Sequence, residues 1–126
     1  AGFAAGTPWI GIPANHTTIN AATEINDSHS IFSFYRQLIT IRKTYPVISE
    51  GDVHFIDSKN DKVIAYERTL GTEKVLVFAN FSGQEVHTVP ASTVDGLQVL
   101  IGNYPQTSLS EGSLILKPFE ARAFIS

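Results

Sequence analysis

Hydrophobic residues recur along this chain with two different periods. Between residues 27 and 46 they fall three or four positions apart, which is the spacing of one face of an α-helix. The residues of this stripe are Ile31, Phe34, Tyr35, Leu38, Ile41 and Tyr45. Asp27 is a suitable N-cap before the stripe, and Pro46 cannot continue it. The pattern therefore predicts one helix over about residues 28–45.

After Gly51 the pattern changes to short apolar segments separated by polar turns. These segments predict strands over residues 53–56, 63–68, 74–81, 85–89, 98–101, 114–116 and 120–125. Because no helical period separates them, we expect a mainly β fold class, with the strands in an antiparallel β-sandwich. In the last segment one face carries Phe119, Ala121, Ala123 and Ile125, and the opposite face carries Glu120, Arg122 and Phe124.

The first 26 residues show no sustained period and predict a long loop. This segment holds four large apolar side chains, which are Trp9, Ile10, Ile12 and Ile19. An irregular segment of this length needs a surface to pack on, either in its own domain or in a neighbouring one. Because a loop, one helix and a sandwich follow in this order, we expect the chain to be the C-terminal piece of a larger polypeptide.

The composition argues against several classes of partner and site. The chain has 126 residues, of which 43% are hydrophobic and 17% charged, as is usual for a globular domain. A net charge of -3 provides no basic field for nucleic acid or anionic lipid, so we expect neither a nucleic-acid nor a membrane partner. Cysteine is absent, which leaves no disulfide or thiolate metal site and fits the cytoplasmic location that we expect.

The histidines do not predict a metal or catalytic site. His16, His29, His54 and His87 stand at no metal-ligand spacing from one another. Asn15-His16 invites comparison with the Asn-His-Asp tripeptide of sugar-cleaving barrels, but Thr17 stands where that motif has its carboxylate. We therefore expect no metal and no cofactor.

Carboxylates and aromatic residues likewise designate no catalytic group. Five carboxylates lie in expected turns, and these are Asp57, Asp61, Glu73, Asp95 and Glu111. Solvated turn carboxylates are expected to keep nearly ordinary pKa values, which makes them poor general acids. Trp9, Tyr66 and Tyr104 have the rings needed to stack on sugars, but we expect them to pack in the core or at an interface. The expected set of catalytic residues in this chain is empty.

Five stretches carry recognisable patterns in order along the whole chain. They are residues 6–10 (GTPWI) with Ile19-Asn20, 27–31 (DSHSI), 34–43 (FYRQLITIRK), 63–68 (VIAYER) with 75–82 (VLVFANFS), and 118–122 (PFEAR). Together they resemble the α-amylase family of glycoside hydrolases, and within it the oligo-1,6-glucosidase and dextran glucosidase branch. Residues 13–16 (PANH) depart from the N-P-N-Y that is usual in that branch, which leaves the subfamily open.

The resemblance implies two domains. Residues 1–50 would be the end of a (β/α)8 catalytic barrel, with the loop after its eighth strand and the helix at about 28–45. Residues 51–126 would be the C-terminal β-sandwich domain. The missing barrel of the same polypeptide is then the expected partner of the chain.

The resemblance also implies the chemistry of the parent protein. It would be an α-glucosidase that hydrolyses α-1,6- or α-1,4-glucosidic bonds in short oligosaccharides with retention of configuration. Its Asp nucleophile, its Glu acid/base and a second, stabilising Asp would lie on earlier barrel strands. No catalytic residue is therefore carried over to this chain, which we expect to be inactive alone.

Two functions remain open from the sequence. The chain is either the structural C-terminal part of such an enzyme or a free-standing carbohydrate-binding or interaction module of the β-sandwich type. In the first case the apolar helix stripe lacks its barrel, so we expect the isolated chain to self-associate through the helix and the leading loop.

Overall fold

The computed structural model describes residues 5–126, which form two compact units on either side of the peptide bond between Thr40 and Ile41. The first four residues of the expected 1–50 segment lie outside the described residues. Residues 5–20 form bends and turns, as the sequence predicts, but the short helix that follows was expected to be loop. The first helix, α1 (Ala21–Glu24), is capped by Asn20, whose side chain accepts from Thr23 N–H at 3.0 Å.

The predicted long helix is present as α2 (Ile31–Thr44). Asp27 is not its N-cap, so that prediction was wrong. Ser30 stands immediately before the helix, and its Oγ accepts from Ser33 N–H at 3.1 Å. The Asp27 carboxylate instead accepts from His29 N–H at 2.8 Å in a turn. Ser30 caps the helix because it immediately precedes the first helical residue, so its hydroxyl reaches the third helical N–H. The Asp27 carboxylate lies three residues earlier in the chain.

Pro46 does more than end α2. It opens a further helix, α3 (Pro46–Glu50), at the first helical position, where proline loses no hydrogen bond. The short apolar stretch after a proline carried no helical period, so the sequence analysis missed this element. Gly51 then leads into the first strand. A Cβ there would lie 2.5 Å from Val47 O and 2.9 Å from Thr69 O, so only glycine fits between α3 and β2.

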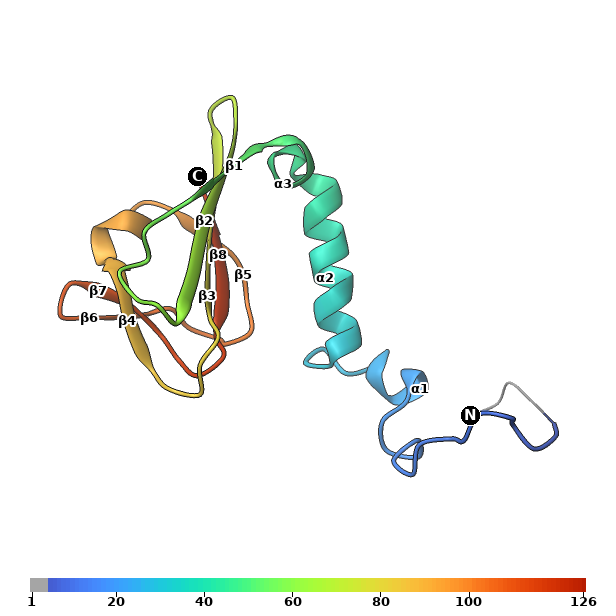
Figure 1. Ribbon diagram of the computed structural model, residues 1–126. Coiled ribbons are helices and arrows are strands. Elements are labelled where there is room, and N and C mark those ends of the chain that lie inside the picture. Colours follow the sequence, from blue (N-terminus) through green and yellow to red (C-terminus); the bar gives the residue numbers. More distant parts are fainter. Residues whose placement is uncertain (1–4) are drawn as a thin grey trace. The chain divides into compact units, whose positions relative to one another are not determined.

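The strands form an antiparallel sandwich of two sheets (Figure 1). The first sheet has the order β1-β2-β3-β8-β5, and the second has the order β4-β7-β6. The strands of the first sheet are β1 (Asp52–Phe55), β2 (Val63–Leu70), β3 (Glu73–Asn80), β8 (Ala121–Ile125) and β5 (Gln98–Gly102). Those of the second are β4 (Val86–Pro90), β7 (Ser113–Leu116) and β6 (Ser108–Ser110).

All seven predicted strands are confirmed with bounds shifted by a few residues. Besides α1 and α3, β6 and the 3₁₀ turn Ala91–Val94 were also not predicted from the sequence. Residues 108–110 read Ser-Leu-Ser, and a single apolar residue gives no alternation to detect. Glu73, expected in a turn, is instead the first residue of β3.

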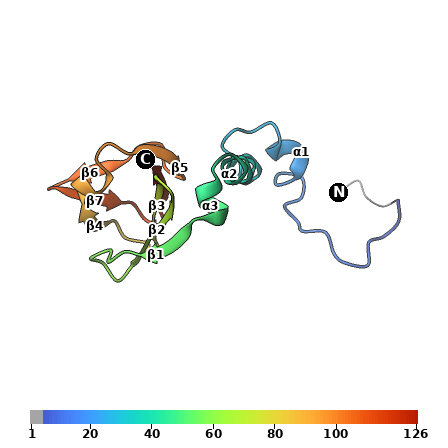
Figure 2. The same ribbon diagram turned by 90° about the horizontal axis from the view of Figure 1, so that it is seen from above.

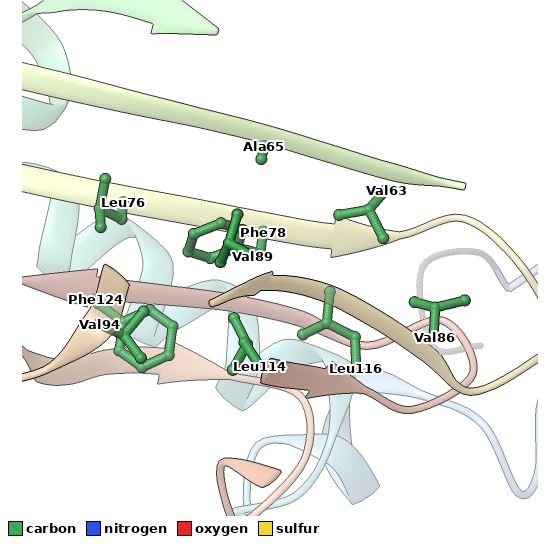
Figure 3. Packing of buried hydrophobic residues seen from close by; sticks show 10 residues of the cluster. All are labelled: Val63, Ala65, Leu76, Phe78, Val86, Val89, Val94, Leu114, Leu116 and Phe124. Carbon is green, nitrogen blue, oxygen red and sulfur yellow. The ribbon is translucent and has the colours of Figure 1, made fainter. Parts of the chain in front are cut away.

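The main core lies between the two sheets (Figure 3). Leu76 and Phe78 point inward from β3, and the Phe78 ring meets Phe124 edge to face at 6.1 Å between ring centroids. Across from them the second sheet contributes Leu114 and Leu116. For the last strand the sequence pattern placed Phe124 on the face opposite Ala123 and Ile125, and the two core clusters confirm this division.

A smaller cluster covers part of the other face of the five-stranded sheet. Val75 on β3 and Ile125 on β8 point outward and pack with Val47 of α3, which is fully buried. Figure 2 shows α3 on the side of this sheet that faces away from β4, β6 and β7. Both faces of the central strands are therefore apolar.

Replacing Phe78 by alanine tests the assignment of the main core. Because Phe78 has no exposed surface, Phe78→Ala should lower the free energy of unfolding by about 3–5 kcal/mol. The control is Leu109→Ala, at a half-exposed site, which should change it by less than about 0.5 kcal/mol. Urea denaturation followed by circular dichroism measures both, and equal effects of the two changes would contradict the assignment.

Candidate functional site: a buried polar clasp and exposed apolar side chains

The four histidines lie apart on separate elements. His16 Nδ1 is 2.9 Å from Pro13 O, and His29 Nδ1 is 3.2 Å from Ser28 Oγ. His54 is on β1, and His87 is on β4. Within residues 5–126 the structure brings together no group of three or more His, Asp or Glu side chains that could hold a metal ion.

The pKa of one turn carboxylate, Asp57, differs from the expected value. The Lys59 side chain donates to Asp57 Oδ2, and the Lys59 backbone N–H donates to Oδ1 at 3.0 Å. These hydrogen bonds lower the pKa of the Asp57 carboxyl below its ordinary value, so the expected near-ordinary pKa was wrong here. A lowered pKa favours the ionised form, which cannot serve as a general acid.

The most strongly buried polar pair is Glu120 with Arg122. Glu120 is fully buried, and only 3% of the Arg122 surface is exposed. Arg122 donates to Glu120 Oε1 from Nε at 2.8 Å, and its Nη2 lies 2.7 Å from the same oxygen. In register Arg122 lies opposite Phe78, so the guanidinium occupies the interior face of β8. Such a pair is tolerated inside a core only when its remaining groups are also bonded.

Backbone groups complete these bonds. Arg122 Nη2 donates to Tyr104 O and to Gln106 O, each at 2.8 Å. Glu120 Oε2 accepts from Lys117 N–H at 2.9 Å. Gly102 lies opposite Arg122 on β5, where a Cβ would approach the guanidinium carbon to 3.1 Å. The absence of a side chain at Gly102 leaves room for the arginine.

Two asparagines hold the same region. Asn80, almost completely buried, donates from Nδ2 to Gln84 O at 2.7 Å and to Lys117 O at 2.9 Å. Asn103 donates from Nδ2 to Phe119 O at 2.8 Å, and its Oδ1 accepts from Ala121 N–H at 2.9 Å. We call Asn80, Asn103, Glu120 and Arg122 the polar clasp.

The clasp fixes the turn that precedes the last strand. Phe119, within this turn, has a φ of 54°, which is a costly conformation for a bulky side chain. Its N–H donates to Ser82 O at 3.0 Å, and its carbonyl accepts from Asn103. Bonds on both sides of the residue hold it in the left-handed region. The stretch of residues 118–122 thus has a structural explanation.

The clasp supplies no acid/base chemistry. Both Glu120 oxygens accept hydrogen bonds from protein groups, and the partner of this carboxylate is a guanidinium. Retaining glycosidases instead need two carboxyl groups about 5–5.5 Å apart on either side of a substrate. Among the described residues Glu120 is the single buried carboxylate. The arrangement stabilises a fold and does not present a reacting group to a sugar.

Sequence reasoning missed this ion pair, although a signal was present. Opposite charges two residues apart lie on the same face of a strand. Here they share that face with Phe124, which belongs to the core. A charged pair that continues an apolar face predicts a buried ion pair.

The aromatic residues considered for sugar stacking lie in different settings. The Tyr104 hydroxyl donates to Pro118 O at 3.0 Å, and Lys117 Nζ lies 5.4 Å from the centre of its ring, so Tyr104 belongs to the packing around the clasp. Tyr66 is half-buried and meets the Phe55 ring edge to face. Trp9 is 94% exposed.

Apolar surface is exposed along the first unit. No residue of α2 is buried, and Ile31 and Tyr35, both from the predicted stripe, are 71% and 61% exposed. The side chains around Trp9 are also open, since Ile10 is 62% exposed. None of the helices of residues 5–126 is both long enough and apolar enough to span a bilayer.

Two family models match different stretches of this chain. The family model for the α-amylase catalytic domain matches residues 1–51, and the model for the C-terminal domain of the α-amylase SusG matches residues 63–122. The chain is 36% identical to the oligo-1,6-glucosidase of Bacillus cereus over 98% of its own length. It spans 23% of the length of that relative.

Solved structures of similar proteins share the fold of this chain. The trehalose-6-phosphate hydrolase of Bacillus licheniformis superposes with a TM-score of 0.83 at 34% identity, over 96% of this chain and 22% of that one. The trehalulose synthase MutB of Pseudomonas mesoacidophila MX-45 gives a TM-score of 0.83 at 36% identity, over 99% and 23% of the two chains. The β-sandwich of this chain has the fold of the C-terminal domain that the second family model describes.

Removing one partner of the buried ion pair tests the role of the clasp. Arg122→Met leaves the Glu120 carboxylate buried without its cation, which should cost about 3–5 kcal/mol of unfolding free energy. The matched control is Lys59→Met, which removes the cation of the exposed pair with Asp57 and should have little effect on stability, because water screens this pair. Urea denaturation compares the two variants, and an Arg122→Met cost as small as that of Lys59→Met would show that the clasp does not stabilise the sandwich.

Proposed function

Because this chain belongs to the α-amylase family, we propose that it is the C-terminal part of a glucoside hydrolase and that its own role is structural. The observation that carries the proposal is the order of the two matches, catalytic domain over residues 1–51 and C-terminal domain over 63–122. The proposed division is residues 1–50 as the end of the catalytic barrel and residues 51–126 as the β-sandwich domain.

The proposed parent is an α-glucosidase that hydrolyses α-1,6- or α-1,4-glucosidic bonds in short oligosaccharides with retention. The names of the relatives support a glucoside substrate, since they include an oligo-1,6-glucosidase and a trehalose-6-phosphate hydrolase. The reacting carboxylates belong to the preceding part of the polypeptide, so the set of catalytic residues in this chain is empty. Its partner is that catalytic barrel, and its proposed location is the cytoplasm.

The geometry supports a bracing role. The buried polar groups of the clasp hydrogen-bond to other protein groups around one turn and the last strand, as the bonds of Glu120 and Arg122 illustrate. Large apolar side chains are exposed in the first unit, with Ile31 and Tyr35 as the clearest examples. Exposed apolar side chains of this kind mark an interface with protein.

An activity assay tests whether hydrolysis depends on a catalytic domain outside this chain. The purified 126-residue chain should hydrolyse neither isomaltose nor p-nitrophenyl α-glucoside, because the nucleophile and the acid/base lie elsewhere. The product of the complete gene, which should contain a preceding catalytic barrel, should hydrolyse at least one of them. Turnover by the 126-residue chain alone would disprove the proposal.

Calorimetry tests the alternative of a carbohydrate-binding module. Titration of the chain with maltose, isomaltose and dextran should give no heat of binding, and saturable binding would favour that alternative.

Self-association of the isolated chain is a second expected outcome. Apolar area removed from water contributes about 25 cal/mol per Å², so the exposed stripe of α2 should drive dimerisation. Sedimentation velocity should show a dimer at high concentration that Ile31→Ser with Tyr35→Ser returns to monomer. Leu109→Ser, at an exposed site of β6, is the control and should leave the dimer intact. A strictly monomeric profile of the unchanged chain would contradict this expectation.

A further inference from the structure

Asp95-Gly96 is the single Asp-Gly pair of the chain, and it lies in the turn between the 3₁₀ turn Ala91–Val94 and β5. Both residues are exposed. Gly96 has a φ of 76°, and a Cβ built on it would meet no heavy atom within 4 Å. The space around the peptide bond between the two residues is therefore open.

Hydrogen bonds hold the residues on either side of this peptide but not the peptide itself. Asp95 N–H donates to Ser92 O at 3.3 Å, and Leu97 N–H donates to Val94 O at 3.2 Å. Within residues 5–126 the Gly96 N–H and the Asp95 carbonyl take part in no hydrogen bond, and the Asp95 carboxyl group has no partner. Asp95 is extended, with a ψ of 132°, so the peptide must rotate before the Gly96 nitrogen faces the side chain. No side chain on Gly96 and no hydrogen bond opposes that rotation.

Two other exposed aspartates are restrained in ways that this turn is not. Asp61 is followed by Lys62, whose N–H donates to Asn60 Oδ1 at 3.0 Å, so the nitrogen after Asp61 is held away from its carboxyl. The Asp57 carboxylate accepts from both the backbone and the side chain of Lys59, and these bonds lower the pKa of that carboxyl. They keep it ionised, whereas attack on a carboxyl carbon proceeds more readily when the group is protonated and can lose water.

We propose that Asp95 is a modification site, at which the folded protein converts aspartate to isoaspartate without an enzyme. The Gly96 nitrogen attacks Cγ of the protonated carboxyl, an N–Cγ bond forms, and one Cγ–O bond breaks. The hydroxyl leaves with the proton of the nitrogen as water, which closes a succinimide ring. Water then adds to the backbone carbonyl carbon and breaks its bond to the same nitrogen. The main chain now runs through Cβ and Cγ, and the composition of the protein is unchanged.

The position of the turn gives the modification a structural consequence. Val94 is a buried member of the main core, and Leu97 packs against that core, so both sides of the turn are anchored. Isomerisation adds one carbon to the main chain between these anchors. Gln98 and Val99, the next residues, pair with Ile125 and Phe124 of β8. Because a packed core does not absorb an added carbon freely, the register of β5 on β8 is weakened. This modification goes beyond the proposed function and needs no catalytic domain.

Incubation of the folded 126-residue chain at neutral pH tests the proposal. Samples are withdrawn over time and digested, and electron-transfer fragmentation of the peptides locates isoaspartate. Isoaspartate should accumulate at residue 95 and not at residue 61. A synthetic peptide of residues 90–101, which has the same sequence without the fold, shows that the modification is detected when it forms. Isoaspartate in that peptide but none at residue 95 of the folded chain would overturn the proposal, by showing that the fold protects the turn.

Two conservative variants separate the chemistry of the turn from general ageing. Asp95→Glu keeps the charge at a position where the carboxyl has no partner, but its longer side chain must close a larger and less readily formed ring. This variant should lose the modification at residue 95, whereas Asp61→Glu should retain it in full. Unchanged total isoaspartate in Asp95→Glu would place the modification elsewhere and overturn the assignment.

Thermal unfolding of the same samples tests the consequence for β5. As isoaspartate accumulates, the melting temperature of the unchanged chain should fall by several degrees, because the modified turn no longer fits between its two anchors. Asp95→Glu incubated alongside should keep its initial melting temperature. Equal losses in the two proteins would show that ageing weakens the sandwich for another reason, and would overturn the link between this turn and β5.

Discussion

The five-stranded sheet is apolar on both faces, and this constraint shapes the rest of the structure. A strand such as β3 alternates Leu76 and Phe78 inward with Val75 and Val77 outward, so each face needs its own cover. The second sheet covers the inward face and produces a sandwich core. Helix α3 covers only part of the outward face. Burial of apolar surface is the main favourable term in folding and in association, so the uncovered part connects the fold of this domain to its proposed role beside a catalytic domain.

The polar clasp adds specificity to this apolar framework. A buried ion pair gives little net stability, but removing one partner is costly, and Glu120 and Arg122 have their remaining groups bonded to the backbone. The bonds of Phe119 to Ser82 O and from the Asn103 side chain hold the turn in a left-handed conformation just before the last strand begins. Because β8 pairs with both β3 and β5, the start of this strand determines the register in the middle of the sheet. The clasp therefore acts on the same sheet that packs against the second sheet on one face and against α3 on the other.

Elements with a strong period could be predicted from the sequence, and those set by tertiary contacts could not. The stripe of α2 and the alternation of β2 and β8 were visible because apolar residues repeat at fixed spacings, and β3 was visible as a continuous apolar run between turns. Ser30 as N-cap, α3 after Pro46 and the short β6 were missed, since each depends on contacts that the hydrophobic pattern does not encode. The lowered pKa of Asp57 depends on a neighbouring lysine two residues on. The family resemblance suggested a supporting role, but only the registered strands show which aromatic rings of the sheet are left exposed.

Deletion of residues 51–126 from the product of the complete gene tests the central claim most directly. If the sandwich braces the catalytic domain, the shortened protein exposes the apolar surface that the sheet had covered. It should then lose soluble folded enzyme and glucosidase activity together, and addition of the separate sandwich should restore part of both. A shortened protein with the melting temperature and the activity of the complete one would contradict the account.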